Sequence, residues 1–181
     1  MHKGKGLFPL SSVQREIWFE QTLYPETPLY NIACYNRICG KIDVEIFRQA
    51  VILLVQENEA LRLRLTERDG VPLQSFPEMP LVDIPLIDCS KEADPLQAAL
   101  AGMQETIRRP FRLFDEPLFR YTLYKLAEDC HLWSQTCHHL IVDGWAGGVI
   151  MKQVAAFYNA LMRGDPLPVR PGVPYLDFVA A

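Results

Sequence analysis

Apolar residues recur every three or four positions in three parts of the chain, which is the spacing of one helix face. The three sets are Val44, Phe47, Val51 and Leu54; Leu96, Ala99, Met103 and Ile107; and Ile150, Val154, Phe157 and Leu161. We therefore expect three amphipathic helices, each with one face packed on a core.

Capping residues mark the ends of these helices and add a fourth helix before them. Asp43 and Asp94 precede the first two sets, where a side chain caps the first turn. Gly164 follows the third set, where a left-handed residue commonly ends a helix. Ser11 and Gln14 have the spacing of a capping box, in which each side chain bonds the backbone amide of the other residue. This pair predicts a helix that begins after Ser11.

Strand patterns fill the segments between the helices. We expect strands at residues 29–42, 61–65, 72–76, 118–126 and 131–137. Asp69-Gly70 supplies a hairpin turn between the second and third strands, and the acidic turn Glu128-Asp129 joins the last two. The order of elements predicts an α/β fold, an α+β sandwich with a mainly antiparallel or mixed sheet flanked by helices.

Prolines mark the end of the folded unit. Residues 7–165 hold the predicted elements, and residues 1–6 form a flexible leader. Four prolines between positions 166 and 174 predict an extended connector, and residues 175–181 have the pattern of a new element. We therefore expect one lobe at residues 7–165, followed at residues 166–181 by a connector and the start of a further lobe.

Composition and charge narrow the class of protein. With 181 residues, of which 49% are hydrophobic and 22% charged, the chain has the size and composition of one globular domain. Its net charge is -4 and its basic residues are scattered, so we expect no nucleic-acid partner. The apolar runs are far shorter than the roughly 20 residues of a membrane helix. Residues 7–10 are too short for the apolar region of a signal peptide, so we expect a cytoplasmic protein.

The cysteines do not form a recognisable framework. Cys34, Cys39, Cys89, Cys130 and Cys137 are odd in number and lack a Cys-x-x-Cys pair. This pattern argues against both a disulfide framework and a structural zinc site. We expect free thiols that are mostly buried.

Two histidines and an aspartate lie between the last predicted strand and the last helix, where residues 137–144 read CHHLIVDG. An imidazole that titrates near pH 7 can accept a proton from an amine or hydroxyl, and a carboxylate can orient it. A structural interpretation is equally consistent, with the histidines bonded to backbone and Asp143 capping the helix. A metal site is disfavoured, because adjacent histidines on an extended chain point to opposite sides. Trp145, which follows, is expected to pack in the core.

Four segments resemble, in the right order, the motifs of condensation domains from nonribosomal peptide synthetases. Residues 138–145 (HHLIVDGW) are similar to the His-His-x-x-x-Asp-Gly signature. Residues 10–18 (LSSVQREIW) and 57–62 (ENEALR) resemble the first two core motifs, and residues 110–120 carry a Pro-Phe-x-Leu and Pro-Leu-x-Arg run. The chain thus resembles the N-terminal lobe of the two-lobed chloramphenicol acetyltransferase-like fold, whose C-terminal lobe is missing.

The resemblance implies a role for each residue of the histidine segment. His139 is implied as the catalytic residue, placed in a tunnel where two phosphopantetheine arms meet. His138 and Asp143 are implied to hold the loop in shape, with Arg62 paired to Asp143. Gly144 is expected to allow a close backbone approach. No metal or cofactor-binding residue is implied.

The resemblance also implies a reaction and partners. A donor acyl or peptidyl thioester on one carrier protein would react with the amine of an aminoacyl group on another, giving an amide. The expected partners are donor and acceptor peptidyl carrier proteins, the C-terminal lobe and an adenylation domain, with no intrinsic cofactor. His139 would remove a proton or only orient the amine. The alternatives are a coenzyme A-dependent acyltransferase of the same superfamily and a catalytically silent carrier-binding module.

Overall fold

A computed structural model describes residues 6–78, 82–168 and 175 of the chain. Most of the element expected at residues 175–181 and part of the expected leader and connector lie outside the described residues. The four predicted helices are present as α1 (Ser12–Leu23), α2 (Val44–Glu57), α3 (Pro95–Arg108) and α4 (Ala146–Arg163). None of the described helices is long and apolar enough to cross a membrane.

The capping predictions are confirmed. The capping box of Ser11 and Gln14 is complete, and the side chains of Asp43 and Asp94 accept from amides in the first turns of α2 and α3. Gly164 ends α4 in the left-handed region with φ of 68°. These local contacts set where each helix begins or ends.

Seven strands in the described residues form two sheets. The smaller sheet has the order β1 (Phe8–Pro9), β4 (Val71–Ser75), β3 (Arg64–Arg68). The larger sheet has the order β2 (Asn31–Cys39), β7 (Cys130–His138), β6 (Phe119–Ala127), β5 (Leu86–Asp88). All pairs are antiparallel except β5 with β6, so the larger sheet is mixed, as predicted. Asp69 and Gly70 both have positive φ in the tight β3–β4 turn.

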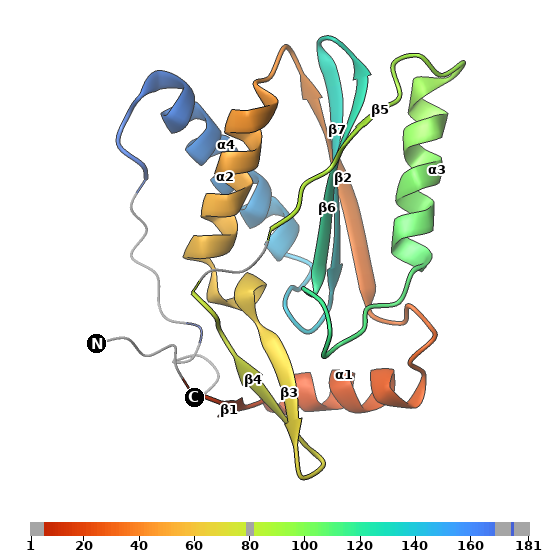
Figure 1. The fold of residues 1–181 in the computed structure, drawn as a ribbon, viewed down its shortest axis with the longest axis vertical. Coiled ribbons are helices and arrows are strands. Elements are labelled where there is room, and N and C mark those ends of the chain that lie inside the picture. Colours follow the sequence, from red (N-terminus) through yellow and green to blue (C-terminus); the bar gives the residue numbers. More distant parts are fainter. Residues whose placement is uncertain (1–5, 79–81, 169–174, 176–181) are drawn as a thin grey trace.

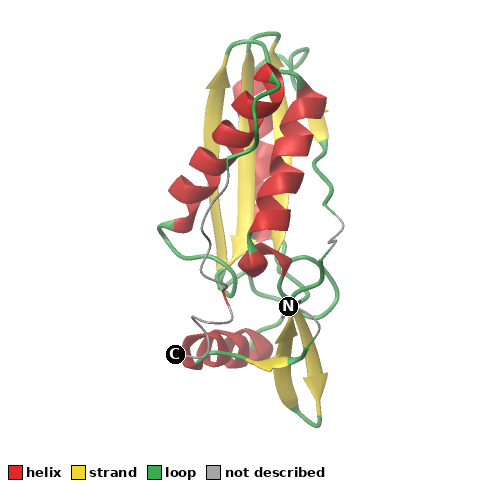
Figure 2. Ribbon diagram, turned by 90° about the vertical axis from the view of Figure 1, so that its left-hand side faces the viewer, coloured by secondary structure: helices red, strands yellow, loops and turns green. Residues whose placement is uncertain are grey.

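The larger sheet lies between two helical layers. Helices α2 and α4 pack together on one face, and α3 covers the other (Figures 1 and 2). Helix α1 and the smaller sheet lie beyond the end of the large sheet at which β7 finishes (Figure 1). The fold therefore brings α1 beside the predicted histidine segment.

Several local expectations are wrong. Glu59–Arg62 is a 3-10 helix, so the strand expected at 61–65 begins only at Arg64. Trp145 is 84% exposed rather than packed in the core, because it lies in the loop that leads into α4. Cys34 and Cys39 are exposed because β2 is an edge strand, although all five cysteines are free as predicted.

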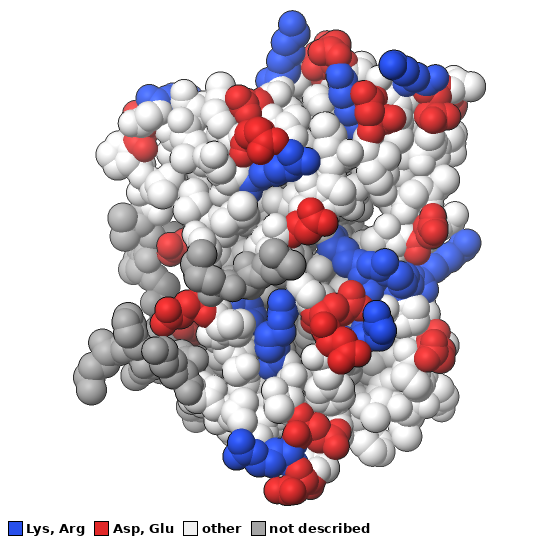
Figure 3. Space-filling view, viewed as in Figure 1, with Lys and Arg blue, Asp and Glu red and all other residues white. Residues whose placement is uncertain are grey.

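Charges of both signs are distributed over the surface. On the face shown in Figure 3, Lys and Arg side chains lie beside Asp and Glu over most elements. The ion pairs Arg48–Glu45 and Lys125–Glu128 are examples of this pairing. This distribution agrees with the scattered basic residues of the sequence.

Candidate active site at the histidine loop

The backbone of the histidine segment is hydrogen-bonded to the residues just before β6 and just before β2. The amide of His138 donates to the carbonyl oxygen of Leu118 at 2.9 Å, and the amide of His139 donates to that of Tyr30 at 2.9 Å. The amide of Ile141 then donates to the carbonyl oxygen of His138 at 3.1 Å, which turns the chain away from β7. The segment is therefore an ordered turn at the end of β7.

His138 is a fixed, neutral imidazole. Its side chain is completely buried, and its Nδ1 accepts from the amide of Leu140 at 3.2 Å. The ring proton must then be on Nε2, which lies 3.4 Å from Oε1 of Gln21. Burial, and to a smaller extent the neighbouring His139, lower the pKa of His138 to about 4. This residue supports the turn rather than exchanging protons near neutral pH.

His139 has the opposite environment. Its side chain is exposed, and one edge of its ring faces Tyr30, with 6.4 Å between ring centroids and an interplanar angle of 85°. An exposed imidazole on an anchored backbone is accessible to a substrate and can accept or share a proton. Of the two histidines, His139 is the one available for chemistry.

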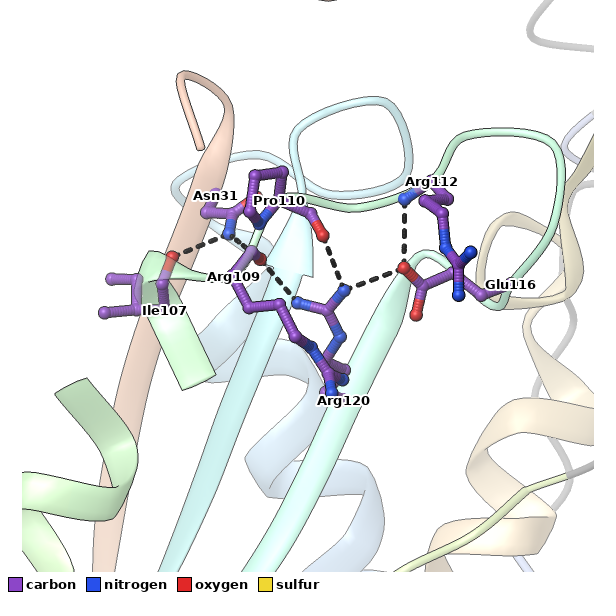
Figure 4. Close-up of polar contacts among 7 residues, drawn as sticks. All are labelled: Asn31, Ile107, Arg109, Pro110, Arg112, Glu116 and Arg120. Carbon is purple, nitrogen blue, oxygen red and sulfur yellow. Dashed lines mark hydrogen bonds and ion pairs between the residues drawn. The ribbon is translucent and has the colours of Figure 1, made fainter. Parts of the chain in front are cut away.

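Arg120 organises the segment that precedes β6. Its guanidinium donates to the carbonyl oxygens of Arg109 at 2.7 Å and Pro110 at 2.9 Å, and to Glu116 at 2.8 Å (Figure 4). It also lies over the ring of Phe111, 3.8 Å from the centroid. The Pro-Phe and Pro-Leu-x-Arg segments found in the sequence therefore form one cluster.

This cluster reaches the histidine loop through an aromatic contact. The ring of Phe111 meets that of His138 edge to face, with 6.0 Å between centroids. Asn31 ties β2 to the same region, because its Nδ2 donates to the carbonyl oxygens of Ile107 at 2.7 Å and Arg109 at 3.0 Å (Figure 4). The motif at residues 110–120 thus contacts the buried side of the histidine loop through Phe111 and His138.

Asp143 caps α4 and does not pair with Arg62. Its Oδ1 accepts from the amides of Trp145 and Ala146, each at 3.0 Å. Arg62 instead donates to the carbonyl oxygen of Pro77 at 3.0 Å. The expected Arg62–Asp143 ion pair is wrong for this structure, because Arg62 is directed to the backbone of Pro77 and Asp143 to the start of α4. The structural interpretation of Asp143 holds.

Gly144 has no close neighbour in the described residues. A Cβ at this position would meet no heavy atom within 4 Å, and its φ is not positive. The predicted close backbone approach is therefore not seen. Within the described ranges, no group of three or more His, Cys, Asp or Glu side chains is arranged to hold a metal ion.

Two buried glutamines of α1 contact the histidine loop, and the sequence predicted neither contact, although it identified Gln14 as part of a capping box. Gln21 contacts His138, and Nε2 of Gln14 donates to the carbonyl oxygen of Leu140 at 3.2 Å. They are 2% and 4% exposed, respectively. Because they are seven residues apart, both lie on one helix face, which also carries Ile17. Two polar residues on an otherwise apolar face were the available signal that their side chains bind other buried groups.

Comparison with known proteins gives the context of this site. The sequence profile of the condensation domain matches residues 5–181. A dimodular nonribosomal peptide synthase of Bacillus subtilis (strain 168) is 35% identical over 158 residues, which cover 87% of this chain and 7% of that protein. An isonitrile lipopeptide synthase of Streptomyces coeruleorubidus is 35% identical over 162 residues, which cover 88% of this chain and 11% of that protein.

Solved structures agree with the sequence comparison. The starter condensation domain of rhizomide synthetase superposes with a TM-score of 0.92 at 34% identity, over 97% of this chain and 43% of that one. The first condensation domain of the calcium-dependent antibiotic synthetase gives a TM-score of 0.90 at 25% identity, over 98% of this chain and 45% of that one. The chain thus spans less than half of the structures that it matches. With its fold and its ordered motifs both matched, the chain belongs to the condensation-domain family of nonribosomal peptide synthetases.

Proposed function

We propose that this chain is the N-terminal lobe of an acyltransferase that forms amide bonds between carrier-bound substrates, and that His139 is its catalytic residue. The observation that carries the proposal is the contrast within the loop. His138 is buried and neutral, whereas His139 is exposed on the same anchored turn. Such a turn presents one imidazole to a substrate in a fixed position.

The substrates in this proposal are thioesters on the phosphopantetheine arms of two peptidyl carrier proteins. The acceptor amine attacks the donor carbonyl carbon, the new C–N bond forms and the C–S bond breaks. The nitrogen loses one proton and the departing thiolate gains one. His139 accepts that proton or holds the amine through a hydrogen bond, and neither role requires a metal or a redox cofactor.

A second lobe completes the proposed site. The chain covers 43% of the superposed starter condensation domain, so more than half of that protein lies outside the matched region. Trp145 and Val149 are exposed apolar residues at the beginning of α4, next to the histidine loop. We assign this surface to contact with the C-terminal lobe, with an adenylation domain and carrier proteins elsewhere in the assembly.

One comparison favours a second donor class. A mutant of the rhizomide synthetase starter condensation domain has been solved in complex with C8-CoA. A fatty acyl donor presented on coenzyme A is therefore the competing proposal for this chain. The ratio of kcat/KM values for carrier-bound and coenzyme A-bound donors distinguishes the two, since equal values would favour coenzyme A.

The test is amide formation by the two-lobed domain with loaded donor and acceptor carriers, followed by mass spectrometry. His139→Ala is expected to lower the rate by roughly 10²–10⁴-fold if the imidazole transfers a proton, and by less if it only orients the amine. Gln104→Ala, an exposed change on α3, is the control and should retain full activity. Wild-type turnover in His139→Ala would overturn the proposal.

A further inference from the structure

Gln21 is a buried polar residue whose side chain joins the end of α1 to His138. Its Nε2 donates to the carbonyl oxygens of Tyr24 at 2.8 Å and Thr27 at 2.9 Å. Both hydrogens of the amide nitrogen are therefore used at the end of α1. This fixes the orientation of the amide group and directs Oε1 toward His138.

The contact with His138 continues into the loop backbone. Oε1 of Gln21 lies 3.4 Å from Nε2 of His138, and Nδ1 of the same ring accepts from the amide of Leu140 at 3.2 Å. A ring protonated on Nε2 satisfies both contacts at once. If the acceptor at Gln21 were lost, a buried Nε2–H would lack a partner, which favours rotation of the ring and release of the Leu140 amide.

We propose that Gln21 is a positioning residue, which holds His138 in one tautomer and thereby fixes the turn that presents His139. This inference rests on the proposed function of His139 for its effect on rate, whereas its effect on the loop is independent of any reaction. Gln14 strengthens the arrangement from two helical turns away, since it binds the carbonyl oxygen of Leu140. Helix α1 thus holds both backbone groups of Leu140, the residue after His139. Gln14 binds the Leu140 carbonyl oxygen directly, and Gln21 contacts His138, which accepts from the Leu140 amide.

The first experiment measures the loop in this chain by nuclear magnetic resonance. In the wild-type chain, ¹⁵N shifts of His138 should report a proton on Nε2 and none on Nδ1. Gln21→Met removes the acceptor and should accelerate hydrogen exchange of the Leu140 amide by at least about tenfold. The His139 amide, which donates to Tyr30, is the internal reference. Unchanged exchange at Leu140 in Gln21→Met would overturn the proposal.

A second variant separates loop positioning from support of the helix end. Gln21→Glu keeps an oxygen acceptor for His138 but loses the amide donors that bind Tyr24 and Thr27. Measured at about pH 8, it should keep the Leu140 amide protected, whereas Gln21→Met should not. Equal loss of protection in both variants, or unfolding of both, would show a role limited to the helix end and reject the proposal. Gln104→Met on α3 is the matched control.

The effect on rate is measured in the two-lobed domain. Gln21→Met should lower kcat by about tenfold or more with KM nearly unchanged, because the imidazole of His139 is displaced without loss of substrate contacts. Gln21→Glu should recover most of that rate. If His139→Ala has no effect on turnover, the proposed function fails while the exchange measurements still test Gln21. If His139→Ala is inactive and Gln21→Met is fully active, the positioning role is rejected.

Discussion

At the scale of single residues, two adjacent histidines have separate properties because they lie on either side of the end of β7. His138 is the last residue of β7, and His139 is in the turn that follows it. His138 faces a buried environment with Phe111 and Gln21, and His139 faces the surface. The sequence predicted this division by resemblance, but the partners of His138 come from distant segments and were not predictable from local pattern.

The burial of His138 gives the chain a pH-dependent stability. The pKa of its imidazole is about 4 in the folded chain and 6.5 in the reference state, so the unfolded chain binds more protons between these values. The free energy of unfolding should therefore fall as pH is lowered from 6.5 to 4. At roughly 1.4 kcal/mol per pKa unit, His138 contributes a loss on the order of 3 kcal/mol.

Urea unfolding across this pH range measures the effect. His138→Gln has no titrating ring, so its unfolding free energy should fall less steeply than that of the wild-type chain. The carboxylates titrate in both variants, and the difference between the two slopes isolates His138. Parallel pH profiles would mean that His138 is not held neutral.

At the scale of elements, the sequence predicted the parts that local chemistry determines. Helices α1 to α3 begin at the expected caps, and Gly164 ends α4. The short strands Phe8–Pro9 and Leu86–Asp88 were missed, because two or three residues carry no periodic pattern. They form only by pairing with β4 and β6, which are distant in sequence.

The start of α4 illustrates why the site was predicted only in part. An aspartate three residues before a helix suits both a helix cap and an ion pair, and sequence alone allowed either. In the structure, Asp143 caps the first turn of α4. Trp145, the residue immediately before the helix, makes no side-chain capping bond. Arg62 was assigned to Asp143 by resemblance, and its partner Pro77 had no recognisable signal.

If Asp143 caps α4 and does not pair with Arg62, mutations of the two residues should have additive effects on the free energy of unfolding. Asp143→Ala should lower the free energy of unfolding by about 1 kcal/mol, the typical contribution of a helix cap. Arg62→Ala should act independently, so the double variant should equal the sum within roughly 0.5 kcal/mol. Asp143→Asn, which keeps a side-chain acceptor, should lose less than Asp143→Ala. A coupling well above about 1 kcal/mol in the double-mutant cycle would restore the ion pair.

At the scale of the whole molecule, most of the described elements share one main core, and α3 packs with β6 and β7 in a second, smaller cluster. Buried apolar residues from α2, α4 and the sheets contact one another continuously, including Val51, Leu65, Trp133 and Val154. The mixed sheet and its two helical layers agree with the fold class predicted from the order of elements. Their arrangement into one lobe was implied by resemblance, since pattern alone does not define how two sheets meet.

This core and the proposed second lobe predict a folded but inactive chain. The chain should unfold in one cooperative transition, observed by circular dichroism and calorimetry, because β6 and β7 contribute side chains to both of its hydrophobic clusters and so join them. It should form no amide from loaded carriers, because the proposed reaction channel lies between two lobes. Full turnover by this chain alone would contradict the lobe assignment. A two-lobed protein containing the same residues is the positive control.

The exposure of Trp145 also makes this site observable by optical spectroscopy. The other two tryptophans, Trp18 and Trp133, are shielded by core side chains, whereas the indole of Trp145 is 84% exposed. Intrinsic fluorescence quenching by a small solute therefore reports selectively on the start of α4. Any lobe or carrier that covers this surface would shift the emission to shorter wavelength. Trp145 fluorescence can therefore report binding at the surface beside the histidine loop without an added label.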